Sequence, residues 1–281
     1  MSARGPSSLV GDEELVRALA EVTVLDVRYR TGGPAGREEY GAGHVPGASY
    51  VDLDADLADP PGPRGRHPLP APDAFEQAMR AAGVRGDRPV VVYDDWSGHA
   101  AARCWWLLRY FGHPDVRVLD GGWSAWSAAG HPVETGPGST PEPGDLTVVP
   151  GGMPVLDADA VLSTAVVVDA RAPERYRGEV EPIDPVAGHI PGAVNVPTSR
   201  NLDEGGRLRS PEELRELYAS VGARPDVDVA AYCGSGVTAA LDVLAMDVAG
   251  IPAALYPGSW SEWVADPDRP VETITITSGP P

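Results

Sequence analysis

Ala230-Ala-Tyr-Cys233-Gly-Ser-Gly-Val-Thr-Ala-Ala240 is the stretch around which the chain is organised. The apolar run 227–232 predicts a short buried strand, and the segment 238–249 predicts a helix. The cysteine therefore lies in a tight loop between strand and helix, where backbone N–H groups point inward and the helix start adds a positive dipole end. A thiol held there is expected to ionise readily, and the thiolate is the nucleophilic form.

The two glycines of this loop support that interpretation. Gly234 and Gly236 permit backbone angles closed to other residues and keep side chains out of the loop interior. The alternative is that Cys233 is a small buried core residue, as lone cysteines usually are. The coincidence of two glycines, a strand end and a helix start favours the nucleophile.

The composition excludes several classes of function. The chain has 281 residues, enough for two domains, and a net charge of −19, which argues against nucleic acid and anionic membranes as partners. Two cysteines cannot form a disulfide framework, and no Cys/His group has zinc-ligand spacing, so we expect no metal and no cofactor. No stretch is long enough to span a membrane and none resembles a signal segment, so we expect a cytoplasmic protein.

The two halves of the chain repeat the same order of motifs, which indicates a duplicated domain. We predict one domain at 7–130, a Pro- and Gly-rich linker at 131–152, and a second domain at 153–277. The matched segments are 25–28 with 168–171, 43–48 with 188–193, 90–93 with 229–232, and 121–126 with 258–263.

Each half alternates short apolar strands with helical segments, which predicts an α/β fold with a mostly parallel sheet and helices on both faces. Ligands bind at the carboxyl ends of such strands, so Cys233 and segment 169–171 are predicted to line one crevice. Asp94 occupies the position that matches Cys233, so we expect the first half to be non-catalytic and to form a wall of the cleft. Asp26 and Asp169 are expected to accept backbone N–H bonds in the loops that follow them.

These motifs resemble the two-domain rhodanese family, the thiosulfate and 3-mercaptopyruvate sulfurtransferases. The resemblance covers nearly the whole chain. It rests on Gly-His-Val/Ile-Pro-Gly-Ala in both halves, on Asp169-Ala-Arg171, on the Cys233 loop ending in Gly-Val-Thr-Ala, and on Gly258-Ser-Trp260. It implies two tandem rhodanese-like domains, and a cysteine that accepts a sulfane sulfur as a persulfide and passes it to a second nucleophile.

The residues after the cysteine discriminate between sulfur donors within this family. Members that use thiosulfate typically carry Arg-Lys there, whereas members that use 3-mercaptopyruvate carry Gly-Ser or Gly-Thr. Gly234-Ser235 therefore implies 3-mercaptopyruvate as the donor, with thiosulfate as the alternative. A thiol acceptor such as thioredoxin or glutathione, or cyanide, is implied in the same way.

The resemblance also implies which residues bind the donor. Arg171 resembles the family's substrate-binding arginine, and Arg177 is a candidate for a second contact to the donor carboxylate, which an arginine can bind in a two-pronged way. The remaining expected contacts come from the loop itself, namely Gly234, Gly236, Val237 and Thr238.

A Ser-His-Asp proton relay has been proposed for the mercaptopyruvate enzymes. Its serine maps to Ser235 and its histidine to His44, while the position of its acid falls near Gly32-Gly33, where this sequence has no acid. His189 stands in the same motif in the second half. A structural role for both histidines therefore remains open.

Two interpretations from other classes are also open. A cysteine-dependent phosphatase would need an arginine six residues after the cysteine, and Ala239 stands there, so no side chain could clamp a phosphate. A non-catalytic binding or sulfur-carrier module is the other. Intact mass after incubation with a donor separates them, because a catalytic carrier gains one sulfur, about 32 Da, on Cys233.

Overall fold

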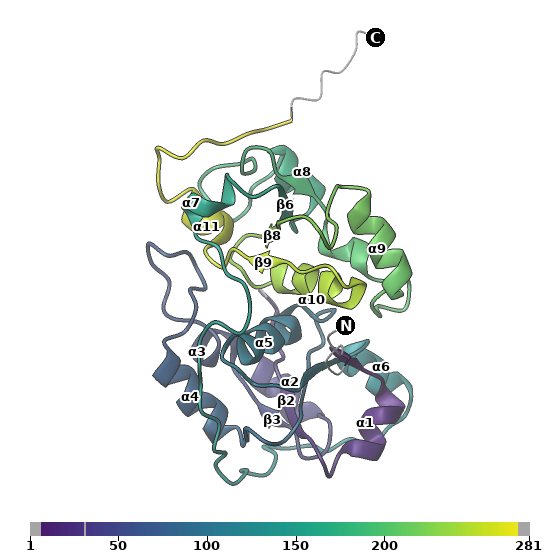
Figure 1. The fold of residues 1–281 in the computed structure, drawn as a ribbon. Coiled ribbons are helices and arrows are strands. Elements are labelled where there is room, and N and C mark those ends of the chain that lie inside the picture. Colours follow the sequence, from purple (N-terminus) through teal and green to yellow (C-terminus); the bar gives the residue numbers. More distant parts are fainter. Residues whose placement is uncertain (1–6, 31, 275–281) are drawn as a thin grey trace.

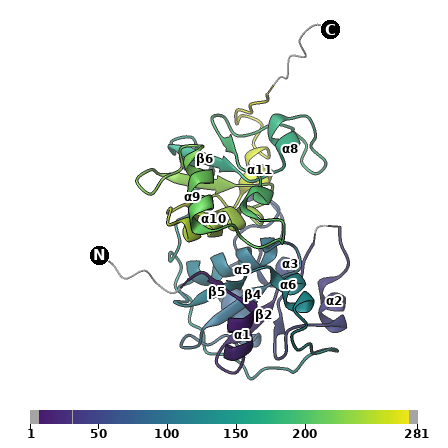
Figure 2. The same cartoon turned by 90° about the vertical axis from the view of Figure 1, so that its right-hand side faces the viewer.

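The computed structural model describes residues 7–30 and 32–274, so residues 275–277 of the predicted second domain lie outside the described residues. It contains two β-sheets, one from each half of the chain, and every strand pair in them is parallel (Figures 1 and 2). The strand order is β1-β5-β4-β2-β3 in the first sheet and β7-β6-β8-β9 in the second. The strands are β1 (Leu9–Val10), β2 (Thr23–Asp26), β3 (Ser49–Tyr50), β4 (Val90–Tyr93), β5 (Val116–Leu119), β6 (Val166–Asp169), β7 (Val194–Asn195), β8 (Val229–Tyr232) and β9 (Ala254–Leu255).

Helices cover both faces of each sheet, which confirms the predicted α/β architecture. The first half contains α1 (Asp12–Ala18), α2 (Gly36–Ala42), α3 (Leu53–Asp56), α4 (Pro72–Ala81), α5 (His99–Tyr110) and α6 (Gly122–Ala128). The second half contains α7 (Ala158–Val161), α8 (Pro173–Arg177), the 3₁₀ helix Thr198–Asn201, α9 (Pro211–Ala219), α10 (Ala239–Ala249) and α11 (Ser259–Trp263).

Three buried apolar clusters follow from the alternation of side chains along the strands. In β4, Val90 and Val92 point into a central cluster, whereas Val91 and Tyr93 point into an outer cluster with α1, α2 and α6. The central cluster is continuous through both halves, because α5 and α10 pack against each other between the two sheets (Figure 1). This shared core places the loop after β8 against the first half of the chain.

The same buried arginine–aspartate pair stabilises each half. In both copies the aspartate ends a strand, accepts the N–H of the arginine two residues later, and pairs with its guanidinium, which confirms that Asp26 and Asp169 anchor their loops. The arginine also donates to a glycine carbonyl and lies 4.5 Å from the centre of a tryptophan ring. The two sets are Asp26, Arg28, Gly43 and Trp123, and Asp169, Arg171, Gly188 and Trp260.

The predicted linker carries no named helix or strand within the described chain between α6 and α7. It runs along the first half, with backbone hydrogen bonds from Gly144 to Arg80 and from Val149 to Phe111. The boundaries at 130 and 153 remain predictions. None of the helices in the described ranges is both long enough and apolar enough to cross a bilayer.

Candidate active site

A cavity of about 730 Å³ lies between the two halves, beside the loop that follows β8. The predicted loop residues Cys233, Gly234, Ser235, Val237 and Thr238 all line it. The opposite wall comes from the first half. Its residues are Tyr29, Asp54, Ala58, Asp59, Pro61, Arg66, His67 and Trp96.

The Cys233 sulfur lies at the base of this cavity with 1% of the residue exposed. The backbone N–H of Gly236 donates to Sγ over 3.1 Å, and the backbone N–H of Cys233 donates to Ser259 Oγ over 3.1 Å. Gly236 has φ +76°, and a Cβ there would lie 2.2 Å from the carbonyl oxygen of Pro257, so only glycine fits. The loop therefore presents a main-chain donor to the sulfur and can stabilise negative charge on it.

The matching loop of the first half is filled by its own carboxylate. Asp94 accepts the backbone N–H groups of Trp96 and Gly98 at 2.8 Å each and that of Ala101 at 2.9 Å. Its side chain is buried, with 1% of the residue exposed. The backbone N–H groups that could stabilise a reactive anion in this half are thus already hydrogen-bonded to Asp94.

A hydrogen-bonded chain crosses the cavity from the second half to the first. Ser235 Oγ lies 2.8 Å from His67 Nδ1, and His67 Nε2 lies 3.2 Å from Asp54 Oδ1. The Asp54 carboxylate can only accept, so His67 Nε2–H donates to it. Nδ1 then carries no proton and accepts a hydrogen bond from the Ser235 hydroxyl. Burial lowers the pKa of His67, and Asp54 only partly opposes this, so the ring is neutral at pH 7.

The predicted histidine His44 does not line the cavity, whereas His67 and Asp54 do. The His44 ring is fully buried, donates from Nδ1 to the Tyr40 carbonyl over 2.8 Å and stacks on the Tyr40 ring at 3.8 Å. His189 repeats this arrangement with Tyr176 in the second half. Both histidines therefore make the same contacts in the two halves, as expected of the structural role that the sequence left open.

Arg171 and Arg177 also lie away from the cavity lining. The Arg171 guanidinium is held by Asp169 in the buried pair described above, because a carboxylate that is 0% exposed requires a cation beside it. Arg177 pairs with Glu179 at 2.8 Å on the surface. The structure thus places neither arginine in the lining of the cavity where the sequence predicted that they bind the donor.

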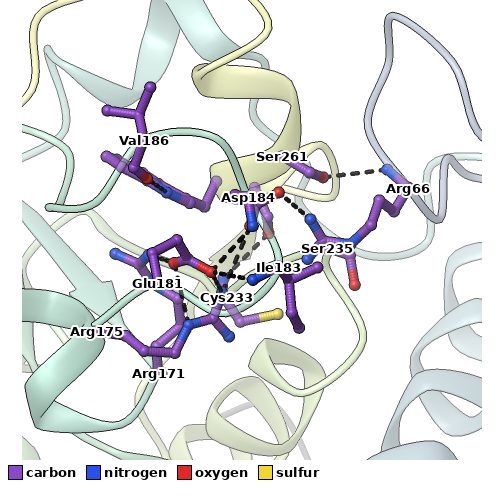
Figure 3. Close-up of polar contacts among 12 residues, drawn as sticks. Arg66, Arg171, Arg175, Glu181, Ile183, Asp184, Val186, Cys233, Ser235 and Ser261 are labelled. Carbon is purple, nitrogen blue, oxygen red and sulfur yellow. Dashed lines mark hydrogen bonds and ion pairs between the residues drawn. The ribbon is translucent and has the colours of Figure 1, made fainter. Parts of the chain in front are cut away.

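Arg66 and Arg175 line the cavity instead, one from each half (Figure 3). Arg175 donates from Nε and Nη2 to Glu181, over 3.1 and 2.6 Å, while Arg66 forms an ion pair with Asp184. A Cβ on Gly234 would lie 2.8 Å from Arg66 Nη2 and 3.6 Å from Arg175 Nη1. Both guanidinium groups therefore lie over the loop at Gly234.

Comparison with known proteins decides the family. The rhodanese-like domain family matches residues 12–129 and 156–266. The chain belongs to this family. It is 45% identical to a putative thiosulfate sulfurtransferase of Mycobacterium tuberculosis, covering 96% of this chain and 98% of the relative, and 44% identical to a probable 3-mercaptopyruvate sulfurtransferase of Pseudomonas aeruginosa, covering 95% and 98%.

A solved structure agrees with these relatives. The crystal structure of a 3-mercaptopyruvate sulfotransferase from Escherichia coli superposes with a TM-score of 0.81 at 34% identity, covering 91% of this chain and 99% of that one. The chain is thus a two-domain rhodanese and a sulfurtransferase.

Sequence reasoning missed four residues that this rhodanese brings to its cavity. Asp54, Arg66 and His67 lie in the proline-rich stretch 52–72, which the sequence analysis did not use, and Arg175 is two residues from the predicted Arg177. The irregular run between α3 and α4, which carries Arg66 and His67, was itself a signal, because irregular loops of about 12–15 residues or more are usually functional or disordered.

Proposed function

We propose that this rhodanese takes sulfur from 3-mercaptopyruvate onto Cys233 and passes it to a thiol acceptor or to cyanide. The observation that carries the proposal is the chain Ser235–His67–Asp54 beside the thiol. Cleaving the C–S bond of 3-mercaptopyruvate leaves a pyruvate enolate that must gain a proton, whereas thiosulfate releases sulfite and needs none. A proton relay in the cavity is therefore needed for 3-mercaptopyruvate and not for thiosulfate.

The proposed first step conserves atoms and electrons. The Cys233 thiolate forms an S–S bond to the donor sulfur, the donor C–S bond breaks, and its electron pair becomes the enolate. The donor's thiol proton passes through the Ser235 hydroxyl to the neutral His67, and the resulting imidazolium returns a proton through Ser235 to the enolate carbon, giving pyruvate and a Cys233 persulfide. The Gly236 N–H stabilises the sulfur anion before and after transfer.

The charges over the loop favour a singly charged donor. Arg66 and Arg175 pair with Asp184 and Glu181. Glu181 also pairs with Arg171, whose other partner is Asp169, so three cations meet three carboxylates. A donor carboxylate can compete for one guanidinium, but this balanced group offers no excess cation for a dianion such as thiosulfate.

In the second step an acceptor thiolate attacks the outer sulfur of the persulfide, the S–S bond breaks, and the Cys233 thiolate returns. Thioredoxin, glutathione and cyanide are the acceptors that this chemistry allows. Both cysteines are free, which supports a reducing location such as the cytoplasm.

Initial rates with 3-mercaptopyruvate and with thiosulfate, with cyanide as the acceptor, test the proposal. We expect a higher kcat/KM with 3-mercaptopyruvate, no turnover for Cys233→Ser, and a mass gain of about 32 Da on wild-type enzyme incubated with donor alone. A preference for thiosulfate would refute the donor, and turnover by Cys233→Ser would refute the nucleophile.

Thiosulfate is the second candidate donor, because the Mycobacterium tuberculosis relative carries that name. His67→Gln distinguishes the two donors. We expect it to reduce turnover with 3-mercaptopyruvate by about 10²–10⁴-fold, the usual contribution of a positioned acid or base, while leaving any thiosulfate activity largely intact.

A further inference from the structure

Arg103, in the middle of α5, is a fully buried cation that none of the steps above uses. Its side chain crosses from the first half to the nucleophile loop of the second, and its Nε has no hydrogen-bond partner among the described residues. The guanidinium donates only to backbone carbonyls. These are Gly236 at 3.3 Å, Leu57 at 3.3 Å, His67 at 3.1 Å and Pro68 at 3.4 Å.

The charge on Arg103 has no carboxylate to balance it within residues 7–30 and 32–274. Burying an unpaired charge is costly, so a fold that retains one normally supplies an anion nearby. Burial lowers the pKa of Arg103 to about 10, which still leaves the group charged at neutral pH, and negative charge on Cys233 acts in the opposite direction.

The backbone of one residue connects this cation to the reactive sulfur. The Gly236 N–H donates to Cys233 Sγ over 3.1 Å, while the Gly236 carbonyl accepts from Arg103 Nη1. The His67 carbonyl accepts from Nη2 of the same guanidinium. Arg103 thus contacts both the residue that holds the sulfur and the residue that forms the relay.

Asp242 on α10 is the other buried ionisable group that faces Cys233 from the core. Burial raises the pKa of Asp242 well above its usual range, which disfavours its anion, and its Oδ1 accepts from Asn201 rather than from Arg103. Arg66 and Arg175 face the sulfur from the cavity side but are paired with carboxylates. Cys233 is therefore the anion available to Arg103.

We propose that Arg103 is the buried counter-cation of the Cys233 thiolate and persulfide, and that its planar fork positions Gly236 and His67 in one geometry across the two halves. The proposal depends on Cys233 being the nucleophile of the proposed function. It does not depend on which donor is used, because the ionisation of the thiol can be measured without any donor.

The test is the pH dependence of Cys233 alkylation by iodoacetamide, in which the S–C bond forms and iodide leaves. Arg103→Gln keeps a hydrogen-bond donor but removes the charge, and we expect it to raise the midpoint of the alkylation profile by about 1–2 pH units. Arg103→Lys keeps the charge and should bring the midpoint back toward wild type. Peptide mass identifies the alkylated residue, and the fully buried Cys104 should not react.

Arg109→Gln is the matched control, because Arg109 lies on the same helix but its guanidinium faces the Trp105 ring, 6.0 Å from the ring centre. It should leave the midpoint unchanged. A folded Arg103→Gln protein with a wild-type midpoint would overturn the proposal.

If Arg103→Gln does not fold and Arg103→Lys does, the kinetics of Arg103→Lys test the positioning role. A lysine cannot reproduce the guanidinium fork, so kcat should fall about tenfold at an unchanged KM. An alkylation profile and a kcat both equal to wild type would overturn the positioning role. Because alkylation and turnover are read separately, a wrong donor assignment leaves the alkylation result standing.

Discussion

Replacing Arg175 and Arg171 by alanine, one at a time, should separate donor binding from folding. Arg175 lines the cavity, and Glu181 occupies its Nε and Nη2, which leaves Nη1 directed at the loop near Gly234. A hydrogen bond to a charged group contributes about 1.5–3 kcal/mol, and with one arm engaged we take the lower value of ~1.5 kcal/mol. Arg175→Ala should therefore lower kcat/KM for 3-mercaptopyruvate roughly tenfold.

Arg171→Ala should have the opposite profile. It leaves Asp169 buried without its cation, which costs about 3–5 kcal/mol, and at about 2–4 °C per kcal/mol the melting temperature should fall by roughly 10 °C. Arg28→Ala is the matched control, because Arg28 makes the same contacts with Asp26 in the half that lacks the thiol. Both variants should lose similar stability, and neither should change KM in the protein that remains folded.

Thermal unfolding and initial rates on the three purified variants check this reasoning. A tenfold rise in KM for Arg171→Ala at an unchanged melting temperature, together with wild-type kinetics for Arg175→Ala, would refute it. That outcome would return the donor site to the arginine that the sequence motif suggested.

Three further predictions follow from the same contacts. Asp184→Asn removes the carboxylate that pairs with Arg66, so KM for an anionic donor should fall several-fold in initial-rate assays, while the exposed Glu179→Gln should change nothing. Because burial lowers the pKa of His67, the ring stays neutral as pH falls through 6.5, and the acid limb of the rate profile with 3-mercaptopyruvate should lie below that pH. Asp94→Ala leaves three backbone N–H groups without their acceptor and should lower stability by about 1–3 kcal/mol in chemical denaturation, with kcat unchanged.

The fold was predictable because its signals are local. Four-residue apolar strands, each followed by a polar loop and a helix, identify a parallel sheet, and the repeat of that order identifies two of them. The cysteine loop was equally readable, since strand, glycines and helix start occupy one short stretch of sequence. The contact between Ser235 and His67 joins residues 168 positions apart, and no pattern within either segment encodes it.

Arg171 and His44 were predicted to serve the site but do not line the cavity, and the sequence contained a signal against both predictions. Both residues recur in the half that has no nucleophile, as Arg28 and His189, and both copies make the same buried contacts. A residue that recurs at matching positions in both halves of a duplicated chain is expected to stabilise the fold, because the fold is what the two halves have in common. Chemistry is expected at the positions where the copies differ, as at Cys233.

That argument changes the role of the first half of the chain. Its own loop is satisfied by the Asp94 carboxylate, yet His67, Asp54, Arg66 and Arg103 all come from this half and lie around the thiol loop of the other. Hydrogen bonds of about 3 Å tolerate displacements of only about 0.5 Å before the geometry is lost. The packing of α5 against α10 fixes the two halves relative to each other and so sets the distance from Ser235 to His67. On the proposed mechanism, the second half alone would therefore hold the Cys233 loop without the side chains of His67, Asp54 and Arg103 that the first half brings to it.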